Sequence, residues 1–448
     1  MSAAAAYIVQ LPFPAMAAPH PEVAAYYQDY GRAFASAHSG YFVPDATLWE
    51  LPLWVAHLSG MLEAIGYESR LIDLSTLPAE VETCARSILA ATKPGERVLL
   101  SPLAQNFDLA LAISAILMAE KRITLLGGNM ATLATPGSAT AIHRGPATPT
   151  SLATLLQGSE SVLTGRLEAD AVARWRPSYR LLESYRRKVP LLRLNASHGC
   201  LFACDFCGDA WSRSLTIVAP DVLEYEVSQF ERLFPETRLI YIGDKTFGQS
   251  MEAVRNLLAV FEDRHDYRFV VQTHVLALTP DVLEAMRRLG VVAVELGFES
   301  ASPRLMRSNR KANRDPDFFH QAIRRLREAG MRVVLNVLSG LPEEDSAAHR
   351  ATLDFIDQTA SDVWLYNLYN FVPYPLTAQF ARIRDRIVDW RFCNWREDGL
   401  PVFEPLHVTR EESFRFFVEK VQAAHIAVKR HALAALDETA ITMPALAS

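Results

Sequence analysis

Short apolar segments alternate with amphipathic segments along most of this chain, and that alternation restricts the fold more than any other feature. Before residue 150, the segments YIVQLPFP, SRLIDLS, RVLLSPLA and RITLLGGN are separated by helical patterns such as LWVAHLSGMLEAIG. Strand–helix alternation at this spacing predicts a parallel sheet covered by helices. We therefore predict an α/β protein with a Rossmann-like domain at residues 1–150.

A second strand–helix series begins at Leu191 after a charged connector, which we place at residues 151–190. Its apolar segments are LLRLNAS, RLIYIGD, YRFVVQTH, VVAVELGFE, MRVVLNVLSG and DVWLYNLYNF. Thr279 and Pro280 form a good helix start between two of these segments, and Gly290 a good helix end. Six repeats predict a partial (β/α)6 barrel of the TIM type at residues 191–378, with its chemistry at the carboxyl ends of the strands. Residues 379–448 form a helical region in this prediction, with a frayed end.

Length and composition limit the classes of function. The chain has 448 residues, of which 50% are hydrophobic and 21% charged, and its formal net charge is −6. Such a chain is long enough for two or three domains, and it has no basic block that would favour nucleic acid. The N-terminus lacks the features of a signal peptide, and no segment reaches the roughly 18 apolar residues of a membrane span. We therefore expect a soluble cytoplasmic protein without a nucleic-acid or membrane partner.

Three of the five cysteines, Cys200, Cys204 and Cys207, lie in one segment, ASHGCLFACDFCGDA. Three thiolates at this C-x3-C-x2-C spacing can hold a 4Fe–4S cluster and leave its fourth iron without a protein ligand. A zinc site would need a fourth ligand, which His198 could supply, but structural zinc motifs usually come as two separated pairs. A disulfide fits less well, because the cysteine count is odd and the expected compartment is reducing.

This segment resembles the cluster loop of radical S-adenosylmethionine (SAM) enzymes. The resemblance implies that SAM chelates the open iron and that one electron cleaves it to methionine and a 5′-deoxyadenosyl radical. It also implies that Phe206, which precedes the third cysteine, lies near the adenine. An external electron donor such as flavodoxin or ferredoxin and a small-molecule substrate would complete the system.

The region before the barrel resembles the cobalamin-binding-type domain found in one large subgroup of that family. Gly127 and Gly128 follow a predicted strand, where glycines let a backbone approach a ligand closely, although a simple turn would also explain them. The chain lacks the D-x-H-x-x-G loop that supplies a histidine to cobalt in some cobalamin proteins. It also has His143–Pro146 where subgroup members often show a Gly-Glu-Gly-Glu-like stretch. The resemblance implies cobalamin, without a protein imidazole on the lower face of cobalt.

Two segments at predicted strand ends resemble SAM-binding motifs of the subgroup. In IGDKTFG, Gly243 and Asp244 occupy the position of a short acidic motif that meets the SAM amino group, and a turn aspartate is the alternative. In VELGFES, Glu299 and Ser300 match a Gly-hydrophobic-Glu-Ser segment whose carboxylate can accept from ribose hydroxyls or the methionyl amine. Glu295, which is earlier on the same strand, is a second candidate for that contact.

Two later segments resemble the family as well. NVLSGLPEE resembles a fifth-strand motif in which Asn336 replaces the first glycine, and Gly340 keeps the place expected near the adenine. FVPYPLTAQF resembles a Pro-Tyr-Pro-Gly-Thr segment with Leu376 in place of glycine, and its prolines could present Tyr374 to the substrate. Cys393 lies among aromatic residues, where it is either buried filler or a group that quenches a radical.

Two functions fit these patterns. The first is a cobalamin-dependent radical SAM methyltransferase that methylates an unactivated carbon of a small organic molecule, as in natural-product biosynthesis. The second is a radical SAM dehydratase, dehydrogenase or rearrangement enzyme of natural-product or sugar metabolism with a non-functional cobalamin domain. A zinc or iron–sulfur interaction module is a third, non-enzymatic alternative. We also expect the long insert at 15–50, between the first strand and the first helix, to be a lid or binding loop.

Overall fold

The computed structural model describes residues 4–14, 19–41, 51–166, 173–189, 191–208, 214–312 and 315–434, and the predicted frayed end lies outside them. Two compact units are present, and each takes three segments of the chain. The N-terminal unit contains Met1–Ala17, Pro52–Glu183 and Pro373–Arg396, and the barrel unit contains Ala18–Leu51, Ser184–Val372 and Glu397–Ser448. The boundaries predicted at residues 150, 190 and 378 assume that each domain is one continuous segment, and they stay predictions.

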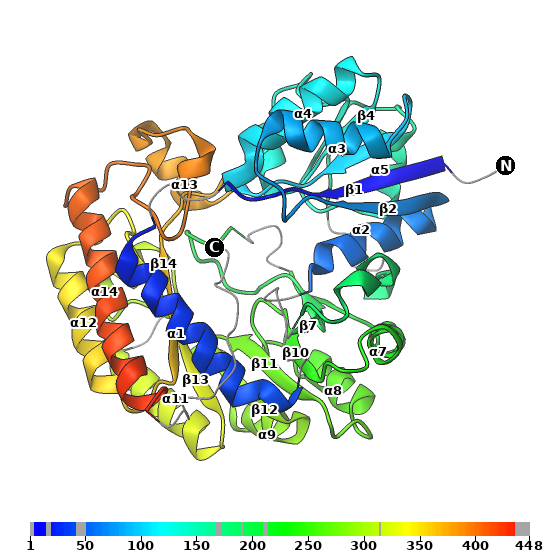
Figure 1. The fold of residues 1–448 in the computed structure, drawn as a ribbon. Helices are drawn as coiled ribbons and strands as arrows, with labels where there is room; N and C mark the ends of the chain where they lie inside the picture. Colours follow the sequence, from blue (N-terminus) through cyan, green and yellow to red (C-terminus); the bar gives the residue numbers. More distant parts are fainter. Residues whose placement is uncertain are drawn as a thin grey trace. The chain divides into compact units, whose positions relative to one another are not determined.

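A six-stranded sheet with the strand order β2-β1-β3-β4-β5-β6 forms the N-terminal unit (Figure 1), and all its strand pairs are parallel. The strands are β1 (Ala4–Gln10), β2 (Tyr67–Asp73), β3 (Arg97–Leu100), β4 (Ile123–Leu126), β5 (Ala141–Arg144) and β6 (Val162–Thr164). The helices are α2 (Leu53–Ala64), α3 (Val81–Ala91), α4 (Phe107–Ala119), α5 (Pro149–Leu156) and α13 (Ala378–Ile383), with short 3-10 turns that include η2 (Ala104–Asn106) and η7 (Phe392–Asn394). The four strands predicted from the sequence are confirmed, and the parallel α/β class with them. Strands β5 and β6 were missed, because β5 (AIHR) has only two apolar residues, whereas β3 (RVLL) and β4 (ITLL) have three each, and β6 has only three residues in all.

The strand order of this sheet reverses beside β1. Strand β1 lies between β2 and β3, so the connections after β1 and after β3 run to opposite sides. Open parallel sheets bind ligands beyond the carboxyl ends of their strands at such a point. Here the loops after β1 and β3 are joined by the Asn106 side chain, whose Nδ2 donates to the Pro12 carbonyl at 3.3 Å. The loops after β1 and β3 therefore meet at the carboxyl edge of the sheet, and the ligand contact predicted at Gly127 and Gly128, after β4, stays a prediction.

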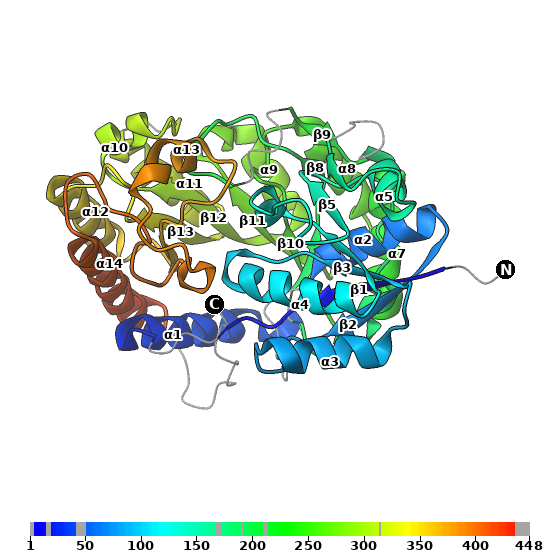
Figure 2. The ribbon, with the colours of Figure 1, turned by 90° about the horizontal axis from the view of Figure 1, so that it is seen from above.

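The barrel unit contains a second six-stranded parallel sheet, in the order β14-β13-β12-β11-β10-β7. Its strands are β7 (Leu192–Leu194), β10 (Leu239–Ile242), β11 (Arg268–Thr273), β12 (Val291–Glu299), β13 (Arg332–Ser339) and β14 (Leu365–Asn370). Its helices are α1 (Pro21–His38), α7 (Pro220–Leu233), α8 (Met251–Val260), α9 (Pro280–Leu289), α10 (Pro303–Ser308), α11 (Pro316–Glu328), α12 (Ser346–Thr359) and α14 (Arg410–His431). The strands follow an arc with helices outside it (Figure 2), as the predicted partial (β/α)6 barrel requires.

Side chains of β12 show which face of this sheet is the interior. Phe298 stacks on Phe355 of α12 and meets Phe319 of α11 edge-on, with ring centroids 4.3 and 5.0 Å apart. Successive side chains of a strand point to opposite faces, so Glu295 and Gly297 face away from these helices, into the barrel. The register shifts after Gly297, and Glu299 lies on the same side, because its Oε1 is 3.4 Å from the position of a Cβ on Gly297. The Tyr241 hydroxyl of β10 confirms the common face, because it donates to Glu295 Oε2 at 2.9 Å. The interior of the barrel is therefore partly polar.

Helix α1 covers the free edge of β14. The Tyr26 hydroxyl donates to the Tyr366 carbonyl and accepts from the Tyr366 amide, and the Tyr27 hydroxyl donates to the Leu368 carbonyl at 2.6 Å. These bonds satisfy backbone groups that an edge strand would otherwise expose. The described part of the insert at 15–50 is thus a helix docked on the sheet edge, whereas we predicted a lid or binding loop.

Helix α14 packs against α1, α12 and β14 (Figure 1), so the predicted helical C-terminal region belongs largely to the barrel unit. Its N-terminus is capped by Thr409, whose side chain accepts from the Glu412 amide at 3.1 Å. The last turn carries Lys429, Arg430 and His431, which suits the negative end of the helix dipole. Among the described residues, no helix is both long enough and apolar enough to cross a membrane.

Candidate active site

The cysteine loop leaves the barrel at the carboxyl end of β7. It starts within a short antiparallel ribbon, in which β8 (Ser197–His198) pairs with β9 (Thr216–Ile217). Cys200, Cys204 and Cys207 form no disulfide with another described cysteine, and all three are half-buried. No three His, Cys, Asp or Glu side chains of the described ranges converge on one metal ion. Thiolates that bind separate irons of a cluster do not need to converge in that way.

Asp244 fixes the stem of the cysteine loop. Its Oδ1 accepts from the Ala196 and Ser197 amides at 2.7 and 2.9 Å, and its Oδ2 accepts from the Ser197 hydroxyl at 2.6 Å. The side chain is buried, and burial raises the pKa of its carboxyl to about 6 despite these donors. The direct contact with the SAM amino group stays a prediction, and the structure gives Asp244 a positioning task that the sequence did not reveal.

Gly243, which precedes Asp244, is a close-approach glycine. A Cβ at this position would lie 2.3 Å from Asn195 Oδ1 and 2.8 Å from Arg193 Nε, both on the neighbouring strand end. A larger residue would push the Asn195 and Arg193 side chains aside. The predicted role of Gly243 in binding SAM through the backbone is untested.

Gln249 and the segment at 309–311 hold the rest of the loop. Gln249 Oε1 accepts from the Leu201 amide at 3.1 Å, and its Nε2 donates to the Gly199 carbonyl at 3.2 Å. On the far side of the loop, the Asp205 amide donates to the Asn309 carbonyl at 2.9 Å, and the Asp205 carboxylate is paired with Arg310. The cysteines are therefore presented by a loop that is fixed at both ends.

A buried ion pair lies beside the cysteines. Lys311 Nζ is 2.9 Å from Glu299 Oε1 and 6.0 Å from the centre of the Phe206 ring. Burial lowers the pKa of Lys311, but the negative charges of Glu299, Cys204 and Cys207 together raise it by more, so the pKa is raised overall. Glu299 has a φ of 72°, an unfavourable backbone conformation for a residue with a side chain. The residue predicted to contact SAM thus faces the barrel interior with Lys311 as its partner.

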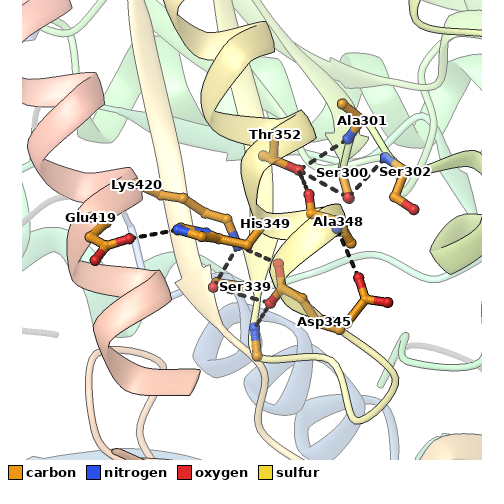
Figure 3. A network of polar contacts seen from close by, with 12 residues as sticks. Ser300, Ala301, Ser302, Ser339, Asp345, Ala348, His349, Thr352, Glu419 and Lys420 are labelled. Atoms are coloured by element: carbon orange, nitrogen blue, oxygen red, sulfur yellow. Dashed lines mark hydrogen bonds and ion pairs between the residues drawn. The ribbon is translucent and has the colours of Figure 1, made fainter. Parts of the chain in front are cut away.

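Ser300 is buried behind the strand end and belongs to a polar network on the helix side (Figure 3). Its hydroxyl is 3.0 Å from the Thr352 hydroxyl of α12, and it accepts from the Ser302 amide at 3.1 Å. Thr352 also accepts from the Ala301 amide at 3.2 Å. The predicted direct contact of Ser300 with SAM is untested, and this network fixes the backbone that carries Glu299.

The backbone of Gly340 is bonded to a second buried ion pair. Its amide donates to Glu344 Oε2 at 2.6 Å, and Glu344 Oε1 is 2.5 Å from Lys420 Nζ of α14. Lys420 also donates to the Ser339 hydroxyl at 2.8 Å (Figure 3). Gly340 has a φ of 74°, and a Cβ there would lie 2.1 Å from Asn370 Oδ1. Only glycine suits this strand end, which is where the sequence predicts an adenine contact.

Asn336 faces the barrel interior from the middle of β13. Its Oδ1 accepts from Asn367 Nδ2 of β14 at 2.9 Å, so the two amides form a cross-strand pair. Glycine in the resembling motif would leave this space open, and the asparagine fills it with a polar group. The predicted contact of Asn336 with SAM stays a prediction.

The remaining predicted residues belong to the N-terminal unit. Tyr374 is half-buried, its carbonyl accepts from the Thr377 hydroxyl at 2.8 Å, and exposed Leu376 adopts a φ of 75° where the resembling motif has glycine. Cys393 is exposed in η7, which packs against η2 and against the start of α4, where the rings of Phe107 and Phe392 meet edge-on. Cys393 is therefore near the loop that follows β3. The roles predicted for Tyr374 and Cys393 in catalysis are untested.

Gly127 and Gly128 follow β4 at the same edge. The Gly127 amide donates to the Leu100 carbonyl at 2.9 Å, which extends the sheet by one bond beyond the strand. Gly128 has a φ of 84°, and a Cβ there would lie 2.9 Å from Ser101 Oγ. At Gly128 both the backbone conformation and the space favour glycine, and the two glycines leave the chain without side chains directly after β4.

Comparison with known families identifies the domain that contains the cysteine loop. Residues 194–356 match the model of the Radical SAM superfamily. These residues form a radical SAM domain. The match begins at the end of β7, includes the three cysteines, and ends within α12, so the described cluster loop and the Glu299 and Gly340 strand ends are all inside it.

Two relatives extend the comparison beyond the radical SAM domain. The bacteriochlorophyllide d C-12(1)-methyltransferase of Chlorobaculum tepidum is 24% identical over 249 residues, which are 53% of this chain and 51% of that protein. The chain thus spans about half the length of the curated relatives it matches. The solved radical SAM methyltransferase TsrM from Kitasatospora setae, with cobalamin and a [4Fe-4S] cluster bound, is 17% identical with a TM-score of 0.62. That alignment covers 92% of this chain and 85% of TsrM, so the two share their fold.

The donor set of the radical SAM domain fits a 4Fe–4S cluster. Three thiols on one loop that is fixed at both ends suit a cluster with one open iron. Burial raises the pKa of the Cys204 thiol, and the charge of Lys311 opposes this shift. Lys311 and Lys420 were missed by sequence reasoning, because neither lies in a recognised motif. Glu344 ends the segment NVLSGLPEE, but its partner Lys420 is 76 residues away.

We expect two substitutions of Asp244 to separate its structural task from its predicted contact with SAM. Asp244→Ala leaves the Ala196 and Ser197 amides without an acceptor, so it should cost about 2–4 kcal/mol of stability and reduce iron retention. Asp244→Asn keeps an acceptor oxygen and should retain iron and thermal stability. Iron content, melting temperature and SAM binding of both variants are the measurements. If Asp244→Asn binds SAM as tightly as the wild type, the carboxylate does not meet the SAM ammonium.

Proposed function

We propose that the protein is a cobalamin-dependent radical SAM methyltransferase that adds a methyl group to carbon in a small organic substrate. The observation that carries the proposal is the presence, in one chain, of a radical SAM domain and a parallel sheet with a side-chain-free edge at Gly127 and Gly128. The relatives named as methyltransferases and the shared fold with TsrM support it. The substrate is not assigned.

The N-terminal unit offers features that suit a bound cobalamin. The strand order reverses at β1 and β3, and Gly128 is packed tightly on Ser101 at this edge. Gln10, at the end of β1, has a buried Oε1 without a hydrogen-bond partner in the described part of the chain, and an amide side chain of the cofactor could donate to it. Cobalamin would supply a carrier for the methyl group.

Neither histidine of this unit is presented as a cobalt ligand. His143 is buried, its Nε2 is 2.7 Å from Ser151 Oγ, and burial lowers its pKa. His57 packs edge-on against Trp175, with ring centroids 4.6 Å apart. We therefore propose that cobalamin binds without an imidazole from the protein on the lower face, as the sequence predicts.

In the barrel unit, the cluster would supply one electron to SAM and so generate the hydrogen-abstracting radical. Cys200, Cys204 and Cys207 would hold it, while Asp244, Gln249 and Arg310 keep the loop in place. Residues of the interior face, including Glu299 and Asn336, would orient SAM and the substrate. A one-electron donor such as flavodoxin or ferredoxin and a reducing cytoplasm are parts of the proposal, because the thiols must stay reduced.

Metal loading tests this proposal directly. Protein purified without oxygen, reconstituted with iron and sulfide and incubated with hydroxocobalamin should retain both iron and near-stoichiometric cobalt after desalting, with the visible spectrum of bound cobalamin. Gly128→Val, which would collide with Ser101, should lose cobalt and keep iron. Iron without cobalt in the wild-type protein would contradict the methyltransferase proposal and favour dehydration, dehydrogenation or rearrangement. Absence of both metals from folded protein would contradict the radical SAM chemistry itself.

A further inference from the structure

His274 lies at the interior end of β11, beside the cysteine loop. The backbone remains extended at His274, with φ −101° and ψ 143°, so its side chain points to the same face as Gln272. Gln272 Oε1 accepts from the Tyr241 hydroxyl at 3.2 Å, which places this face in the barrel interior. The register pairs Thr273 with Leu296, and His274 is therefore at the level of Gly297.

The hydrogen bond that His274 accepts at Nδ1 determines its tautomer. Nδ1 accepts from the Leu276 amide at 3.1 Å, so the proton of the neutral ring is on Nε2. Burial, assisted by the charge of Lys311, lowers the pKa of His274 to about 3, and the ring is neutral at physiological pH. Nε2 is buried and has no partner among the described residues, and the whole side chain is 4% exposed. An unpaired buried donor is costly, which points to an acceptor that a ligand supplies.

The surroundings of the ring indicate the kind of acceptor. His274 stacks on Phe202, with ring centroids 4.1 Å apart and an interplanar angle of 27°. Phe202 lies between Cys200 and Cys204, so the donor is at the edge of the cluster loop. Lys311 Nζ lies 3.1 Å from the position of a Cβ on Gly297, at the level of His274. A neutral donor and a buried ammonium group on the same interior face favour an anionic acceptor.

We propose that His274 donates a hydrogen bond from Nε2 to an anionic acceptor of the bound cofactors, either a sulfur of the cluster or the carboxylate of SAM. This inference rests on the proposed function, because it needs a cluster at the three cysteines. His274 is then a binding residue for the radical SAM chemistry, and Phe202 keeps its ring in place. The two sources of the acceptor give different experimental results.

Two amide substitutions separate the donor from the structural role of Nδ1. His274→Asn places an amide oxygen where Nδ1 is, so it keeps the acceptor for the Leu276 amide and loses the donor. His274→Gln reaches the position of Nε2 with an amide nitrogen, so it keeps the donor and loses the acceptor. A role limited to capping η5 (Val275–Ala277) predicts that His274→Gln is the more damaged variant. The donor role predicts the reverse.

The measurements use anaerobic, reconstituted full-length protein with matched iron content. The first is the midpoint potential of the cluster without SAM, followed by electron paramagnetic resonance, and the second is the dissociation constant of SAM. A lower potential for His274→Asn identifies a cluster sulfur as the acceptor, because hydrogen bonds to sulfur raise the potential. An unchanged potential with a SAM dissociation constant raised about 10- to 100-fold identifies the carboxylate.

In either case His274→Gln should lie nearer to the wild type. Wild-type values of both quantities for His274→Asn, or greater damage in His274→Gln, would overturn the inference while leaving the proposed function intact. Failure of the wild-type protein to bind iron or SAM would instead contradict the proposed function, so the two failures are distinguishable.

Discussion

Replacing Cys200, Cys204 or Cys207 with alanine should abolish iron retention and SAM cleavage together. Each thiolate would bind a different iron, so the loss of any one of them leaves that iron without its protein ligand. The loss should exceed the roughly 10- to 100-fold effect that removal of an outer hydrogen-bond partner has at metal sites. Iron per chain after reconstitution and desalting, and 5′-deoxyadenosine formed with dithionite and SAM, are the quantities to measure.

Cys84→Ala is the matched control for this experiment. Cys84 is buried in α3 of the N-terminal unit, so its loss removes one thiol without touching the cluster loop. The control should keep both iron and SAM cleavage. Full SAM cleavage by any one of the three loop variants would show that the cluster is not held by these cysteines.

Replacing Lys420 with methionine should be among the most destabilising single changes outside the cluster loop. The side chains of Lys420 and Glu344 are 0% and 2% exposed, so the substitution leaves a buried carboxylate without its cation. Breaking such a pair by removing one partner typically costs about 3–5 kcal/mol. We expect a large fall in the unfolding midpoint of the apoprotein in urea, together with weaker SAM binding, because Gly340 is bonded to the same carboxylate.

The double variant Lys420→Met with Glu344→Gln provides the control. Glutamine keeps an acceptor for the Gly340 amide and removes the unpaired charge, so most of the lost stability should return. The predicted order of unfolding midpoints is the wild type, then the double variant, then Lys420→Met. Equal midpoints for the single and double variants would show that the charge of Glu344 is not what makes the single substitution costly.

Local patterns in the sequence predicted most of the fold. All six barrel strands were identified, since each is an apolar run bounded by turn residues. The helix expected after Thr279 begins there, with the Thr279 hydroxyl accepting from the Val282 amide at 3.3 Å, and ends at Gly290 with φ 80°. What the patterns could not give was the unit to which α1 belongs, because that depends on contacts with β14 far along the chain.

In the candidate site, too, local features could be predicted from the sequence and contacts between distant residues could not. The spacing of the cysteines predicted the cluster loop, since the three ligands are local. Lys311 and Lys420 gave no signal, because a lysine destined for a buried ion pair looks like any surface lysine until the fold supplies its carboxylate. Asp244 follows β10, as the sequence predicted, but its hydrogen bonds to Ala196 and Ser197 depend on the neighbouring strand and had no signal in the sequence. Sequence thus predicts ligands that are close along the chain better than the residues that hold them in place.

The covering of β14 by α1 has a consequence for how this chain folds as it is synthesised. Tyr26 leaves the ribosome 340 residues before its partner Tyr366, so helix α1 must wait for almost the whole barrel to be made. Until then α1 lacks its hydrogen-bonding edge, and β14, once made, remains open to pairing with another chain until the helix docks. Closing so long a loop is slow relative to local contacts. Docking of α1 is therefore expected to be a late step. A chain that lacks α1 should fold with an exposed, aggregation-prone barrel edge.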